Sequence, residues 1–132
     1  MKNTARAAIA AAALLLPAAA FAEDLFGPIH MAVNRHEYRG RGCPVEVIYT
    51  GTINFAPHHH GFVFNYSFDR SDGARGQTHV VHVQPGQRSM VVREPWRLGG
   101  RGHEYDAAVT LHVNSGNTHL RESSPTVHIE CR

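Results

Sequence analysis

The chain has 132 residues, of which 42% are hydrophobic, and a formal net charge of +2 with its 11 histidines neutral. Lys2 and Arg6 account for this charge, because residues 23–132 hold 11 arginines and 11 acidic side chains (11 − 11 = 0). The balance excludes the bulk positive charge that is typical of nucleic-acid-binding domains, so no nucleic-acid partner is expected.

The N-terminal segment has the features of a secretory signal. Lys2 and Arg6 are followed by an apolar run, and Ala20-Phe21-Ala22 matches a small-residue cleavage site. The run is too short to span a bilayer, and no cysteine stands at the cleavage site to carry a lipid. We therefore expect a signal peptide at residues 1–22 and a single domain at residues 23–132, with no membrane anchor and a periplasmic or secreted location.

Alternation of apolar and polar residues predicts β-strands along the rest of the chain, and helical periodicity is absent. Polar or Gly-rich turns separate the strands at a spacing of roughly ten residues, which is typical of an antiparallel β-sandwich. We expect seven strands, over Pro28–His36, Cys43–Phe55, Gly61–Phe68, Gln77–Gln84, Ser89–Leu98, His103–Asn114 and a last strand that ends with Val127, Ile129 and Cys131 pointing inward.

One face of the third predicted strand is aromatic. As a core stripe it would pack against Val109, Leu111 and Ile129, whereas a sugar-stacking platform would need the outer face of the sheet. We expect the core position for these four side chains, which are Phe62, Phe64, Tyr66 and Phe68.

Two cysteines frame the predicted sandwich. Cys43 opens the second strand and Cys131 closes the last one. Export to an oxidising compartment and an even number of cysteines favour a disulfide, and strands of alternating direction bring these two strand ends to the same pole. The alternative is a pair of free, buried thiols.

Three segments carry a resemblance to a known family: Cys43-Pro44-Val45, Trp96-Arg97-Leu98-Gly99 and the closing Val127-His128-Ile129-Glu130-Cys131. With the strand count, they make the chain resemble the small immunoglobulin-like or fibronectin-III-like β-sandwich domains of exported bacterial proteins. The antibody pattern is missing, since the sixth strand has no core cysteine and the tryptophan lies on the fifth strand. The resemblance implies architecture and a role in binding, scaffolding or adhesion, with an unknown protein or glycan partner.

Alternating strand direction also sorts the loops between the two poles. The first, third and fifth loops would meet at the disulfide pole, with Arg97 and Arg132 nearby. Clustered guanidinium groups can bind phosphate, carboxylate or sulfated glycan. The alternative, which we favour, is that these arginines form ion pairs with neighbouring acidic side chains. The candidate anion or partner surface comprises Arg39, Arg41, Arg70, Arg75 and Arg101.

Histidines would gather at the opposite pole. His58-His59-His60 links the second and third predicted strands, and His119 follows the sixth. In an extended chain His58 and His60 point the same way, so with His119 they form a candidate site for Zn²⁺, Cu²⁺ or Ni²⁺. The alternative is a solvated turn in a chain that is rich in histidine.

No catalytic motif is present. Two segments, which begin at His36 and His103, start like the H-E-x-x-H zinc motif, but both lack the second histidine. There is no G-x-S-x-G sequence, and cysteines held in a disulfide offer no thiol nucleophile. We therefore expect a non-catalytic, exported binding module. The alternatives are a histidine-dependent metal-binding protein and a small hydrolase with a Ser–His–acid set.

Overall fold

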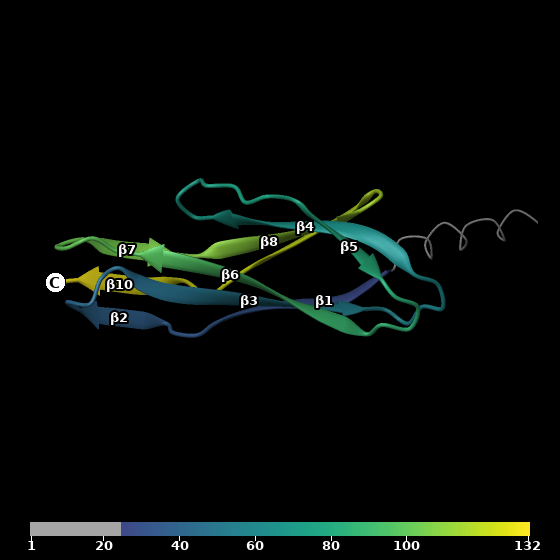
Figure 1. Cartoon of the computed structure of the whole chain (residues 1–132), viewed down its shortest axis with the longest axis horizontal. Helices are drawn as coiled ribbons and strands as arrows, with labels where there is room; N and C mark the ends of the chain where they lie inside the picture. Colours follow the sequence, from purple (N-terminus) through teal and green to yellow (C-terminus); the bar gives the residue numbers. More distant parts are fainter. Residues whose placement is uncertain (1–24) are drawn as a thin grey trace, which may run out of the picture.

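A computed structural model describes residues 25–132 as an all-β domain (Figure 1). The predicted signal peptide and its cleavage site lie outside these residues. Within residues 25–132 there is no helix long and apolar enough to cross a membrane.

The domain has ten strands in three sheets. Figure 1 shows an elongated molecule with β2, β7 and β10 gathered at one end and the long strands β3 and β6 running away from it. The sheet orders are β1-β3-β6, β2-β10-β7 and β5-β4-β8-β9. The strands are β1 (Phe26–Val33), β2 (Glu37–Gly40), β3 (Val45–Phe55), β4 (Phe62–Arg70), β5 (His79–Val83), β6 (Ser89–Leu98), β7 (Glu104–Ala107), β8 (Val109–Ser115), β9 (Thr118–Ser123) and β10 (Val127–Cys131).

The predicted count of seven strands is corrected to ten, because two of the predicted strands are each divided in two and β2 forms where no strand was expected. The first predicted strand corresponds to β1, which pairs with β3, and β2 begins just after its predicted end and pairs with β10. The sixth becomes β7 and β8, and the last becomes β9 and β10. The expectation of an antiparallel fold holds for every pair but one, since β2 and β10 run parallel.

Two serines form hydrogen bonds with the backbone where the later predicted strands are divided. Ser71 accepts from the Ala108 amide through its hydroxyl at 3.0 Å and donates its own amide to Ala108 O at 2.9 Å. The Ser124 hydroxyl likewise accepts from the Val109 amide at 3.0 Å, and the Ser124 amide donates to Val109 O at 2.8 Å. The backbone groups at the break are therefore satisfied, although the ladder is interrupted there.

The core has the composition that the alternation predicts. Phe64 and Phe68 are buried, and Phe62 and Tyr66 pack against the core from its margin. Val109, Leu111 and Ile129 are fully buried, so the aromatic stripe faces inward as expected. Each side chain of this size contributes roughly 1.5–3 kcal/mol when it is buried.

A buried tyrosine joins two of the sheets. Tyr49, in the middle of β3, is fully buried and donates its hydroxyl to Ala107 O, the last residue of β7, at 3.0 Å. Burial raises the pKa of Tyr49 to about 12, and the positive charge of Arg70 opposes this rise. A polar contact between sheets at this depth fixes their relative position.

The predicted disulfide is present and ties the start of β3 to the end of β10. Cys43 and Cys131 are 88 residues apart in sequence, with Cα atoms 5.9 Å apart. Gly99 lies against it with φ of +116°, where a Cβ would come within 2.5 Å of Cys131 Sγ. A side chain is excluded there both by the backbone conformation and by the bridge.

Candidate functional site

An arginine cleft opens at the disulfide end of the domain. We give this name to the hollow of about 530 Å³ that is lined by Arg41, Cys43, Arg101 and Arg132. Its rim is fixed by backbone hydrogen bonds, since Arg132 N donates to Gly40 O at 2.8 Å and Gly102 N donates to Cys131 O at 2.9 Å. The disulfide forms part of the wall, so the cleft belongs to the most constrained part of the chain.

The positive charge of the cleft is poorly neutralised. Among the described residues, neither Arg41 nor Arg101 has a carboxylate within 4.0 Å, and Arg132 reaches Glu130 only at 3.8 Å. Arg39 lies beside the cleft but is paired with Glu37 at 2.8 Å. The two unpaired guanidinium groups are therefore available to an anion that approaches from solvent.

The structure divides the predicted arginine surface. Arg41 and Arg101 meet at the disulfide end as expected, with Arg39 next to them and Arg132 completing the cleft. Arg70 and Arg75 do not join them, and this part of the prediction is corrected. The third loop does reach β7, since Ser71 and Asp72 share a hollow with Gly99 and Glu104–Ala107, but its two arginines do not line the cleft.

Arg70 and Arg75 have other surroundings. Arg70 is paired with Glu94 at 3.4 Å, donates to Pro95 O at 3.2 Å and covers the Trp96 ring at 5.0 Å. Arg75 pairs through its backbone with Asp69 and lines a different hollow. Local pairing, the alternative favoured above, therefore applies to Arg39 and Arg70.

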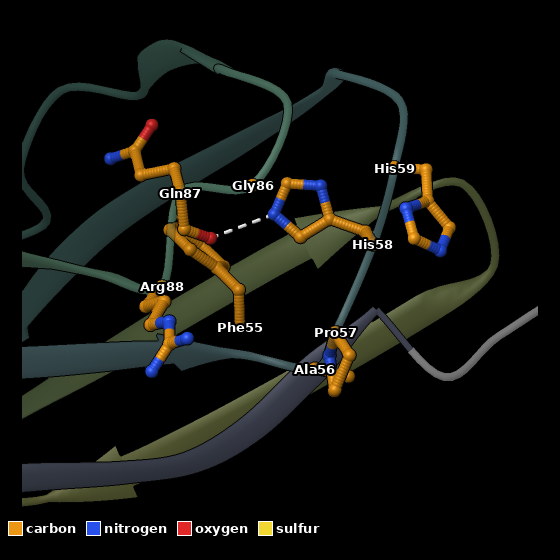
Figure 2. Close-up of a pocket in the computed structure, with 8 residues that line it drawn as sticks. All are labelled: Phe55, Ala56, Pro57, His58, His59, Gly86, Gln87 and Arg88. Carbon is orange, nitrogen blue, oxygen red and sulfur yellow. Dashed lines mark hydrogen bonds between the residues drawn. The ribbon is translucent and has the colours of Figure 1, made fainter.

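A histidine pocket lies at the opposite end, where the β3–β4 loop faces the β5–β6 turn (Figure 2). It measures about 490 Å³ and is lined by Phe55, Ala56, Pro57, His58, His59, Gly86, Gln87 and Arg88. Figure 2 shows His58 pointing across the pocket to Gln87, while His59 points away from it. The His58 ring also makes edge contacts with Phe55 and Phe62, at 6.3 and 5.3 Å between centroids.

Both ring nitrogens of His58 are used within the fold. Nε2 lies 2.7 Å from Gln87 O, and Nδ1 lies 2.9 Å from His60 O. Both partners are backbone carbonyl oxygens, so each ring nitrogen is directed at a group of the fold. Neither nitrogen of His58 therefore faces an open position for a metal ion in this arrangement.

The predicted metal set of His58, His60 and His119 is not brought together. His119 lies on β9, next to β8, where its Nδ1 contacts Asn114 Oδ1 and its ring lies 5.6 Å from that of His112. His58 instead packs against the aromatic end of the core. His119 is held apart from the β3–β4 loop because β9 pairs with β8, with His119 opposite Asn114.

We expect His58→Phe to lower the free energy of unfolding by about 1–2 kcal/mol. The ring contacts are kept in this variant, but the contact with Gln87 O in the facing turn and the contact with His60 O in the same loop are lost, and a hydrogen bond contributes roughly 0.5–1.5 kcal/mol. Urea denaturation measures the difference. His59→Phe is the matched control, because His59 is exposed and has no ring hydrogen bond within residues 25–132. An equal loss in both variants would contradict the role given to His58.

One further hollow joins a serine, an acid and a histidine on the outer face of the sheet β5-β4-β8-β9. Ser67, Asp69 and His112 all line it, and His112 Nε2 lies 2.9 Å from Asp69 Oδ2. Nucleophilic catalysis by serine also needs a hydrogen bond from its hydroxyl to the imidazole. Across the described strands Ser67 makes no such bond, so the arrangement lacks the contact that would activate the hydroxyl.

Comparisons with known proteins add no assignment: no family model matches the chain, and no curated protein matches it either. The function therefore has to be argued from the geometry of these surfaces.

Proposed function

We propose that the chain is an exported, non-catalytic binding module with an immunoglobulin-like β-sandwich, and that its arginine cleft binds the acidic groups of a sulfated glycan. The single observation that supports the ligand class is the pair Arg41 and Arg101, which face a hollow without a carboxylate partner among the described residues. Planar guanidinium groups match the geometry of sulfate and carboxylate oxygens, and they hold these anions more specifically than lysine does.

The sheet orders support the immunoglobulin-like part of the proposal. β1 pairs with β3 in one sheet, and β6 pairs with β3 on its other side. The next strand along the chain, β2, pairs with β10 in a different sheet. β8 follows β7 after one residue, and β10 follows β9 after three residues. β7 pairs with β10 and β8 pairs with β9, so these four strands form one long hairpin, which supports a second layer beside β3 and β6. The disulfide and the N-terminal sequence both favour export.

A double substitution tests the cleft. Arg41→Gln/Arg101→Gln is expected to weaken binding of a heparin-derived oligosaccharide at least tenfold, because two charge-assisted contacts are lost. Calorimetric titration at two salt concentrations measures the affinity, which should fall with added salt. The matched control is Arg93→Gln/Arg121→Gln, which removes the same charge from two exposed arginines on β6 and β9.

The two double variants separate site binding from general charge attraction. The control is expected to change the affinity less than twofold. The proposed function is wrong if the control variant weakens binding as much as the cleft variant does. It is also wrong if the wild type binds neither the sulfated oligosaccharide nor its desulfated form.

A further inference from the structure

The outer face of the sheet β2-β10-β7 carries a group of charged side chains that the proposed function does not use. Side chains two residues apart share a face of a strand, so His128 and Glu130 point the same way from β10. The strand register sets Asp106 opposite His128 and Glu104 opposite Glu130. On the other side of β10, Glu37 and Arg39 occupy the corresponding positions of β2.

Three of these residues have the spacing of metal ligands. One ligating atom from each of Glu104, His128 and Glu130 lies within 4.8 Å of the other two, and this is the only such group among the described residues. Zinc ligands of this kind stand about 2.0–2.2 Å from the ion, which places them about 3.4 Å apart in tetrahedral geometry. Each pair of ligating atoms therefore has to approach by at most about 1.4 Å (4.8 − 3.4) to close on an ion.

A fourth side chain orients the imidazole. Asp106 Oδ1 lies 2.8 Å from His128 Nδ1, so this carboxylate accepts the Nδ1 hydrogen and leaves the lone pair on Nε2. Metal-binding histidines commonly have such a carboxylate on the nitrogen that does not bind the metal, where it fixes the tautomer and makes the ring more basic.

The charge of this face complements a divalent cation. Four carboxylates, those of Glu37, Glu104, Asp106 and Glu130, are opposed by the two guanidinium groups of Arg39 and Arg132 (2 − 4 = −2). Arg39 is held closest to Glu37, at 2.8 Å, and its contact with Glu130 is longer, at 3.5 Å. Glu130 is contacted only at longer range, by Arg39 at 3.5 Å and Arg132 at 3.8 Å, and among the described residues Glu104 has no arginine within 4.0 Å.

We propose that Glu104, His128 and Glu130 bind a divalent transition-metal ion of the zinc class, with Asp106 as the residue that orients the histidine. Two carboxylates and one imidazole supply three ligands, and the exposed face leaves the remaining position to water. The site differs from the histidine set expected from the sequence, and it shares no residue with the arginine cleft.

Calorimetric titration of chelator-treated, folded protein with Zn²⁺ tests this proposal. The wild type is expected to bind one ion, and His128→Ala and Glu104→Gln are each expected to weaken that binding at least tenfold. Asp106→Asn should weaken it about tenfold, through the orientation of the ring rather than by loss of a ligand. If His128→Ala fails to fold, Glu104→Gln alone decides the question, because this exposed side chain at the edge of the sheet is not needed for packing.

Two controls separate the site from adventitious binding to the other histidines. His59→Ala/His60→Ala removes two exposed imidazoles and should leave the one-to-one event unchanged. Arg41→Gln/Arg101→Gln should also leave it unchanged, so that failure of the glycan proposal and failure of this one are distinguishable. The proposal is overturned if the wild type binds no Zn²⁺ with defined stoichiometry. It is also overturned if His59→Ala/His60→Ala abolishes the binding while His128→Ala leaves it unchanged.

Discussion

Removing the disulfide with Cys43→Ser/Cys131→Ser is expected to lower the free energy of unfolding by about 4–5 kcal/mol. The bridge closes a loop between residues 88 apart, and the chain-entropy relation for a loop of this size gives about 4.6 kcal/mol at 25 °C. Domains of this size are stable by only about 5–15 kcal/mol in total, so the variant is expected to be marginal at 37 °C. Urea denaturation of the oxidised wild type and the variant at 25 °C gives the difference.

The same variant also tests the coupling of stability to binding. Cys43 is part of the wall of the arginine cleft, and the turn that carries Arg101 is bonded to Cys131 O. We therefore expect the serine variant to bind the sulfated oligosaccharide more weakly even under conditions in which it is folded. Wild-type protein with its disulfide reduced is the control for the replacement of sulfur by oxygen, and its affinity for the oligosaccharide should equal that of the variant. A loss of stability below about 1 kcal/mol would contradict the chain-entropy argument.

The second large effect is expected at Tyr49, whose hydroxyl links β3 to the end of β7. Tyr49→Phe leaves the packing of the ring intact but removes, among the described residues, the side-chain hydrogen bond to Ala107 O. A hydrogen bond contributes roughly 0.5–1.5 kcal/mol, so the variant should be less stable by about this amount near neutral pH. Tyr105→Phe is the matched control, because the Tyr105 hydroxyl makes no hydrogen bond within the described chain.

Tyr49 also predicts a loss of stability in alkali. Its pKa is about 12 in the folded protein against 10.0 for the free side chain, so folding favours the neutral phenol. The stabilisation is complete below pH 10 and is lost as the unfolded state ionises between pH 10 and 12, by up to about 2.7 kcal/mol at 1.36 kcal/mol per pKa difference of one. Denaturation curves at pH 9, 10 and 11 should show this decline in the wild type and a smaller one in Tyr49→Phe. Equal declines in both proteins would exclude Tyr49 as the source.

The sequence was sufficient to predict the all-β fold, the inward faces and the disulfide. Alternation over Val45 to Ile53 and over Phe62 to Phe68 is set by the two-residue period of a strand, and a buried face keeps that period whatever the neighbouring strands are. The disulfide followed from the positions of two cysteines at strand ends. These properties depend on short stretches of chain, and a local pattern can reveal them.

The divisions of the strands depend on distant residues, which is why the pattern missed them. Ala107 and Val109 both point inward, so alternation continues through the break, and Ser71, which satisfies Ala108 there, is 37 residues away. The division of β9 from β10 falls at Ser124, which bonds Val109, 15 residues away. The surroundings of His119 likewise depend on the pairing of β9 with β8, which sets it opposite Asn114.

The candidate metal cluster illustrates the same limit. The sequence contains two signals of the right kind, Glu104-Tyr105-Asp106 and His128-Ile129-Glu130, in which ligand types recur two residues apart on one face of a strand. Neither signal is informative alone, because the register that sets Glu104 opposite Glu130 is fixed only by the pairing of β7 with β10. The arginine cleft was predicted in part, since Arg41 and Arg101 lie in turns whose ends are fixed by the disulfide.

The parallel pairing of β2 with β10 has a mechanical consequence. Tension that pulls residues 25 and 132 apart would act along these two neighbouring strands, so their hydrogen bonds would be sheared together rather than opened one after another. If they yielded, the covalent link from Cys43 to Cys131 would carry the load, and the residues between the two cysteines could not be extended. A domain held at these two points would then lengthen only by the segment that precedes Cys43, and the strand to be pulled away would be β1, which carries the buried Phe26 and pairs with β3.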